Sequence, residues 1–195
     1  MKGTAMSHSL DSVKFIDVLI AFDVEEILKK NNNALGTDPN QATSLANIPD
    51  SVYMITPLAD AAYGYSQGPL QGINQGEAGN NMRIKANVED EIYWRTVSLT
   101  DKENYKCFLY RFKATGRNLL GEVTYHTENV YEPYPEQGWP DSNGVKTEQR
   151  ADYWAQATVL CPGQETYAFV AAVYDRHAQL KGYVTWNAFI SISSR

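Results

Sequence analysis

The stretch YAFVAAVYDRHAQLKGYVTWNAFISI (residues 167–192) decides the fold, because both of its halves are too apolar for a surface. The first half is apolar at successive positions, which predicts a strand covered on both faces. In the second half, alternate apolar residues share one side of the strand: Val184, Trp186, Ala188, Ile190 and Ile192. The polar segment 175–182 between the halves supplies the reversal, so the stretch predicts a central β-hairpin.

The rest of the chain is expected to fold around this hairpin as one domain. Its 195 residues are 43% hydrophobic, which is enough for one sizeable core over residues 1–195 after a loose N-terminus at 1–11. Thirteen tyrosines and four tryptophans favour strands, because aromatic side chains fit a pleated, half-buried surface.

Further strands are predicted from alternating apolar residues at 12–22, 51–56, 82–88, 92–99, 105–113, 119–131 and 152–160. One short helix follows the first of them, because Asp23 and Glu26 form a capping-box pattern and Asn31 to Asn33 end the apolar stripe. Roughly nine strands and one helix near the N-terminus predict an all-β fold, a two-sheet antiparallel β-sandwich.

Three side chains in or beside the expected strands need partners or an explanation. Asp17 lies in an otherwise apolar strand, where an isolated charge is costly, so we expect an ion pair first and a functional acid second. Cys107 and Cys161 are the two cysteines, and we expect two buried free thiols, with a single disulfide as the alternative.

Residues 63–80 form a Gln-Gly-rich segment, in which Gln-Gly recurs every four residues. Glycine at this density predicts a surface loop, and no Gly-Lys-Ser/Thr follows that would indicate a phosphate-binding loop. We favour a mobile surface loop. In the functional alternative, amide side chains of the loop bind a sugar or a neighbouring molecule: Gln67, Gln71, Asn74 and Gln75.

Residues 132–149 are predicted to form a second, Pro-rich loop, since prolines are excluded from central strands. Tyr134 and Trp139 in this loop could stack on sugar rings, although we favour side chains that tuck back onto the sandwich. Asp141 and Asn143 match only the opening of a calcium loop, so they are kept as candidate ligand-binding residues and no metal is assigned.

Several classes of function are excluded by composition. The net charge of −6 argues against nucleic acid, which needs clustered basic residues. Residues 1–9 are polar and the apolar run 13–22 carries two charges, so we expect no signal peptide, no membrane span and a cytoplasmic protein. The histidines are isolated and no nucleophile motif is present, so we expect no enzyme, cofactor or metal site.

Taken together and in order, several segments resemble the PixA/AidA family of bacterial inclusion-body proteins. They are FIDVLIAFDVEEIL (15–28), VYMI (52–55), MRIKANVEDEIYWR (82–95), TVLCPG (158–163), YAFVAAVYDR (167–176) and GYVTWNAFISI (182–192). The family pattern has Asp-Pro after the last tryptophan, where this chain has Asn187-Ala188, so no role of that aspartate is carried over.

The resemblance implies a non-enzymatic protein that accumulates in bacterial cells, often as cytoplasmic inclusions, with production tied to quorum sensing and host association. The founding member is methionine-rich, whereas this chain has four methionines, so amino-acid storage explains it poorly.

Three functions therefore compete. The first is a self-assembling inclusion-forming homo-oligomer, and the second is a lectin-like module that binds a host glycan through Trp139, Tyr134 and the Gln-Gly loop. The third, ranked last, is a hydrolase, which needs two acids within about 5–10 Å of each other in a cleft.

Overall fold

The computed structural model describes residues 13–62, 81–100, 104–141 and 144–194. Its strands are β1 (Phe15–Phe22), β2 (Thr43–Ser44), β3 (Val52–Ile55), β4 (Met82–Lys85), β5 (Glu91–Ser98), β6 (Tyr105–Ala114), β7 (Thr124–Pro135), β8 (Val145–Thr158), β9 (Gly163–Asp175) and β10 (Leu180–Ser193). The helix α1 spans Val24–Lys30, and two 3₁₀ turns, Pro39–Gln41 and Pro49–Ser51, follow it. The 63–80 loop, including Gln71 and Gln75, lies outside the described residues.

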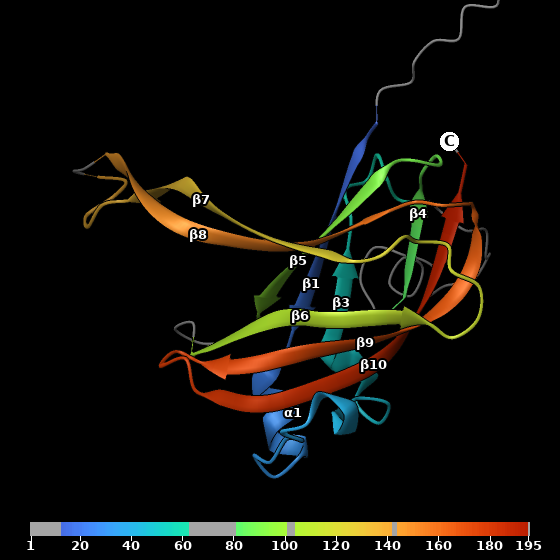
Figure 1. The fold of residues 1–195 in the computed structure, drawn as a ribbon. Helices are drawn as coiled ribbons and strands as arrows, with labels where there is room; N and C mark the ends of the chain where they lie inside the picture. Colours follow the sequence, from blue (N-terminus) through green and yellow to red (C-terminus); the bar gives the residue numbers. More distant parts are fainter. Residues whose placement is uncertain (1–12, 63–80, 101–103, 142–143, 195) are drawn as a thin grey trace, which may run out of the picture.

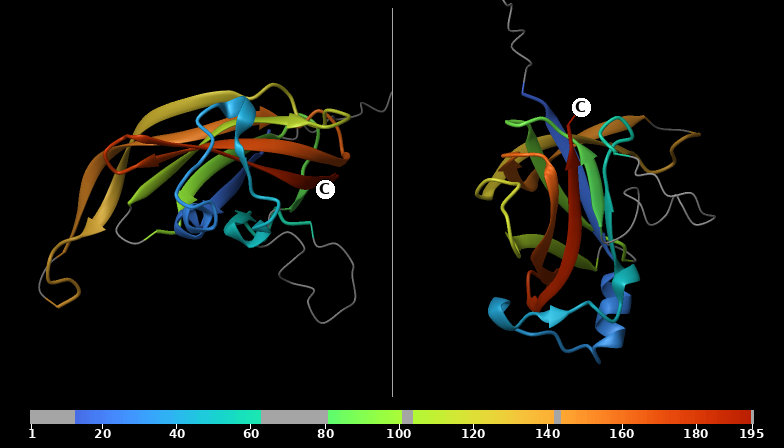
Figure 2. Two further views of the ribbon diagram at one scale, coloured as in Figure 1. Left: turned by 90° about the horizontal axis from the view of Figure 1, so that it is seen from below. Right: turned by 90° about the vertical axis from the view of Figure 1, so that its right-hand side faces the viewer.

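Two sheets pack face to face (Figures 1 and 2). Sheet A has the strand order β3-β1-β5-β8-β7, and sheet B has the order β2-β10-β9-β6, with β4 also paired to β10. This confirms the all-β, two-sheet fold with one short helix near the N-terminus. The purely antiparallel arrangement is wrong, because β1 runs parallel to β5, and β10 runs parallel to β2 and β4. Alternating residues predict which side chains face the core, but not the direction of the neighbouring strand.

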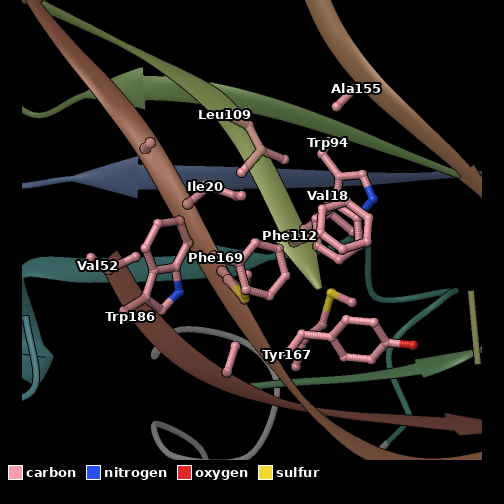
Figure 3. Packing of buried hydrophobic residues seen from close by; sticks show 14 of the residues in the cluster. Val18, Ile20, Val52, Trp94, Leu109, Phe112, Ala155, Tyr167, Phe169 and Trp186 are labelled. Carbon is pink, nitrogen blue, oxygen red and sulfur yellow. The ribbon is translucent and has the colours of Figure 1, made fainter. Parts of the chain in front are cut away.

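The predicted central hairpin is confirmed as β9 and β10, which pair antiparallel between β6 on one side and β2 and β4 on the other. Aromatic side chains fill the space between this hairpin and sheet A (Figure 3). Phe169 stacks on Trp186 at a centroid distance of 5.1 Å and contacts Trp94 of β5 at 5.6 Å. All three are buried, so the hairpin forms one wall of the core.

The predicted helix is confirmed together with its cap. The Asp23 carboxylate accepts a hydrogen bond from the Glu26 amide at 3.0 Å, and Asn32 and Asn33 adopt left-handed backbone angles just beyond the helix. The N-cap satisfies an amide of the first helical turn. The left-handed residues allow the chain to change direction after the last helical turn.

The side chains singled out within strands are now placed. Asp17 forms the expected ion pair, with Arg95, but on the exposed face of β1 and not in the core, because the alternation of β1 buries Ile16 and Val18 instead. Cys107 and Cys161 are both free thiols; Cys107 is buried and Cys161 is half-buried.

The Pro-rich loop is shorter than predicted. Strand β7 continues through Pro133 to Pro135 and β8 already begins at Val145, so the connection between them spans residues 136–144. Prolines are tolerated here because β7 is an edge strand, where an amide facing away from the sheet needs no partner. The prolines correctly excluded a central strand, but they are equally compatible with an edge strand.

Candidate functional site: an exposed two-stranded arm

The β7–β8 hairpin reaches past the end of sheet B (Figures 1 and 2, where it is yellow and orange). Strand β8 pairs with β5 only from Ala155 to Thr158, whereas β7 and β8 pair with each other without a register shift from Thr124 to Pro135. We call the two-stranded part beyond β5, residues 126–135 and 145–154, the arm. Most side chains of the arm are exposed on both of its faces.

Two tyrosines attach the root of the arm to sheet B. The Tyr153 hydroxyl donates to the carbonyl of Leu109 at 2.9 Å, and the Tyr125 hydroxyl donates to the carbonyl of Tyr110, both on β6. The two rings also stack at 6.3 Å. Burial raises the pKa of Tyr125, and burial followed by the neighbouring Tyr125 raises the pKa of Tyr153 to about 12, so both hydroxyls remain donors at neutral pH.

The arm separates uncharged from charged side chains. Because successive side chains of a strand alternate and paired residues share a face, the register divides the arm into two faces. The inner face lies on the side of the buried Ala155 and consists of Thr127, Asn129, Tyr131, Pro133, Pro135, Val145, Thr147, Gln149, Ala151 and Tyr153. No residue of this face carries a charge.

The outer face holds every charge of the arm: Glu128, Glu132, Lys146, Glu148, Arg150 and Asp152. These charges are largely matched within the chain. Arg150 pairs with Glu132, Lys146 pairs with Glu136 of the connecting loop, and Asp152 accepts from Arg95 at 3.3 Å. The outer face is therefore suited to remain in water, where such ion pairs cost little.

An aromatic row crosses the outer side of sheet A and ends on the arm. Phe15 contacts Tyr93 at a centroid distance of 5.1 Å, Tyr93 contacts Trp154 at 6.0 Å, and Trp154 stacks on His126 at 5.4 Å. Phe15 is 56% exposed, so this row is an apolar stripe on the outer surface. The stacking on Trp154 accounts for the position of the His126 ring.

The tip carries the sequence-predicted candidates that the structure describes. Tyr134 lies at the end of β7, and Trp139 and Asp141 lie in the connection that follows; Asn143 falls outside the described residues. Trp139 is 56% exposed and Tyr134 is 39% exposed, so our preference for tucked aromatic side chains is wrong. Both residues lie at the tip of the arm, which the loop prediction could not anticipate.

A family model described as PixA: Inclusion body protein matches residues 14–192. The chain belongs to the PixA inclusion body protein family. The PixA inclusion body protein from Burkholderia cenocepacia J2315 has a similar solved structure, with a TM-score of 0.68 and 19% sequence identity over 95% of this chain and 99% of that one. At this identity the likeness to the solved structure shows the fold. A search among curated proteins found no match.

In this PixA-family chain the described residues offer little that resembles a catalytic centre. Among the surface hollows lined by described residues, one is lined by the single carboxylate Glu122, a second by the single carboxylate Asp175, and a third, beside Trp186, by no carboxylate. Within the same described ranges no three His, Cys, Asp or Glu side chains gather as a metal site would require. None of the helices described is long and apolar enough to cross a membrane.

The feature that sequence reasoning missed is the arm itself. Its signal was present, since over residues 126–135 and 145–154 every charge falls on even-numbered positions. The prolines and the Asn143-Gly144 turn drew attention to the loop instead of to this alternation.

Proposed function

We propose that the chain is a non-enzymatic inclusion-body protein that associates with itself as a homo-oligomer and accumulates in the cytoplasm. The arm is the observation that carries the proposal. An isolated two-stranded hairpin is marginally stable in water, and a stable one needs a third strand or a packed face. Among the described residues, neither a third strand nor a packed layer covers the inner face of the arm beyond Tyr153, so a second protein surface is the natural cover.

The lack of catalytic machinery in the described residues supports the non-enzymatic part. The two histidines described are accounted for by local contacts, since His126 stacks on Trp154 and the amide of His177 donates to Asp175 in the β9–β10 turn. The link of production to quorum sensing and to host association follows from the family resemblance, and comparing transcript levels in sparse and dense cultures tests it.

Light scattering of the purified chain over a wide concentration range tests self-association. We expect the mean mass to rise reversibly with concentration, and we expect the expressed protein to form dense cytoplasmic particles made of folded copies. A strictly monomeric protein that stays dispersed at high expression contradicts the proposal.

A lectin-like binding module is the second candidate, and the exposed Trp139 favours it. Its ring and that of Tyr134 reach solvent at the tip beside Asp141, and flat aromatic faces meet the apolar faces of pyranose rings. A glycan array, run with and without calcium, separates the two functions. Selective binding that Trp139→Ala abolishes and Tyr131→Ala preserves supports the lectin, whereas an unreactive array together with concentration-dependent mass supports self-association.

A further inference from the structure

The inner face of the arm continues the core-facing side of sheet A. Ala155 on this side is fully buried opposite sheet B, and Tyr153 is half-buried where its hydroxyl meets β6. Past this point the arm diverges from sheet B and then reaches beyond its end (Figure 1). The side chains on this side of the arm are exposed and uncharged. Tyr131 there is 73% exposed and Val145 is 56% exposed. A core face that loses its opposite layer while remaining free of charge is typical of an interface.

We propose that the inner face of the arm packs against the inner face of the arm of a second copy, related by a two-fold axis. This inference rests on the proposed self-association and names the surface that carries it. In such an isologous contact each surface must be complementary to itself. The inner face meets this condition, because its hydroxyl and amide groups, on Thr127, Asn129, Thr147 and Gln149, both donate and accept hydrogen bonds.

The charge distribution favours a second copy as the occupant. Each chain carries a net charge of −6, so two copies repel each other wherever their acidic surfaces approach. The inner face allows close contact without bringing charges together. The paired charges of the outer face, such as Arg150 with Glu132, stay in water in this arrangement and need not be desolvated.

The prolines favour contact through the face of the arm over pairing along its edge. Pro133 and Pro135 can occupy β7 only with their nitrogens turned away from β8, toward the free edge. The outer half of that edge therefore lacks two amide donors that a partner strand would need. Adding a strand there leaves carbonyl groups of the partner unsatisfied, whereas face-to-face packing requires no backbone donors.

The size of the arm sets the expected strength. Ten residues on each strand give a length of about 30 Å at roughly 3.3 Å per residue, and two strands give a width of about 10 Å. Two such faces bury roughly 600 Å² of flat area, below the 1,200 Å² or so of a stable interface. We therefore expect a weak dimer that dissociates on dilution. This dimer is the building unit, and a second contact would join the units into larger particles.

The decisive experiment compares Tyr131→Lys with Tyr134→Lys. Both replace an exposed tyrosine of β7 and both change the net charge from −6 to −5, but Tyr131 lies on the inner face and Tyr134 on the outer one. Sedimentation velocity over a concentration series gives the dimer dissociation constant of each. We expect Tyr131→Lys to weaken dimerisation more than about tenfold, because the two-fold axis brings two ammonium groups into one interface. Tyr134→Lys should stay within about twofold of the unmodified chain.

Cross-linking provides a second readout on the face itself. In a Cys161→Ser background, which removes the accessible native thiol, Gln149→Cys places a thiol on the inner face and Glu148→Cys places one on the outer face. A short bis-maleimide should join two copies of the Gln149→Cys protein and leave the Glu148→Cys protein monomeric on a denaturing gel.

The outcomes separate this inference from the proposed function. Suppose that the unmodified chain associates. If Tyr131→Lys then dimerises as strongly, or if Tyr134→Lys is the change that weakens dimerisation, the inner-face contact is overturned while self-association stands. An unmodified chain that is monomeric at every concentration overturns both. Circular dichroism of each variant establishes that it is folded before its mass is interpreted.

Discussion

The hydroxyl of Tyr167 is expected to hold the segment through which the chain crosses from sheet B to sheet A. Tyr167 on β9 is 2% exposed, and its oxygen accepts hydrogen bonds from the amides of Leu119 at 2.8 Å and Leu120 at 3.2 Å. Both leucines are buried in the connection between β6 and β7, ahead of the arm. Replacing Tyr167 with Phe removes this acceptor and changes little else.

The cost follows from the number of groups left without a partner. A buried donor that loses its acceptor costs about 1–3 kcal/mol, and the longer of the two bonds belongs at the low end. Phenylalanine keeps the ring, so no cavity adds to the penalty. The free energy of unfolding should therefore fall by about 2–4 kcal/mol. With a urea dependence of about 2 kcal/mol per molar, the midpoint falls by roughly 1–2 M.

Urea unfolding followed by tryptophan fluorescence measures this change at low protein concentration, where dimers do not contribute. Tyr131→Phe is the matched control, because its side chain is 73% exposed and its midpoint should not move. A shift for Tyr167→Phe no larger than that of the control refutes the reasoning. It means that the two amides find another acceptor, and that the tyrosine oxygen is not what fixes the crossing.

Three further changes test other parts of the fold. Burial raises the pKa of Cys107 and raises that of Tyr153 to about 12. As the pH rises, the unfolded chain therefore loses these protons at a lower pH than the folded chain does. Unfolding titrations should show the free energy of unfolding falling from roughly pH 8.5 upward. Asp23→Ala removes the cap of α1 and should lower the free energy of unfolding by about 1 kcal/mol in urea. In thermal melts Gly182→Ala should destabilise by about 2 kcal/mol or more, because Gly182 has φ 139° and an added Cβ would lie 2.5 Å from the Leu35 side chain. Gly144→Ala should not destabilise, because an added Cβ there meets nothing within 4 Å.

Local patterns in the sequence predicted the elements well but did not predict their neighbours. The alternation around Asp17 correctly implied a strand and an ion pair, yet it did not indicate that the aspartate would face solvent beside Arg95. That placement depends on β1 lying parallel to β5, a pairing between segments separated by three strands in the chain. No periodicity within either segment encodes this direction.

The candidate site was predicted in part. Trp139 and Tyr134 were selected as candidate stacking residues, but they were expected to tuck back onto the sandwich from a loop. They are solvent-accessible and lie at the end of an extended hairpin. The prolines that suggested a loop are compatible with an edge strand. Only the tertiary structure shows that the arm diverges from sheet B and reaches past its end (Figure 1), and this divergence leaves the inner face exposed.

The edges of the sheets indicate what kind of inclusion the proposed self-association would produce. A long exposed edge strand invites pairing between chains and leads toward cross-β aggregates. Three of the edge strands here, β2, β3 and β4, have two to four residues, and the far end of β7 carries two prolines. These strands offer little for a neighbouring chain to pair with.

The remaining edge strand, β6, is ten residues long and is protected differently. Three of its carbonyl groups accept hydrogen bonds from hydroxyls of sheet A, those of Thr96, Tyr125 and Tyr153, which closes this side of the sandwich. Crowding such chains together brings side-chain surfaces into contact before backbone edges. Inclusions built on the proposed contact would consist of folded copies joined through surfaces such as the inner face of the arm. We expect them to redissolve on dilution, as cross-β deposits do not.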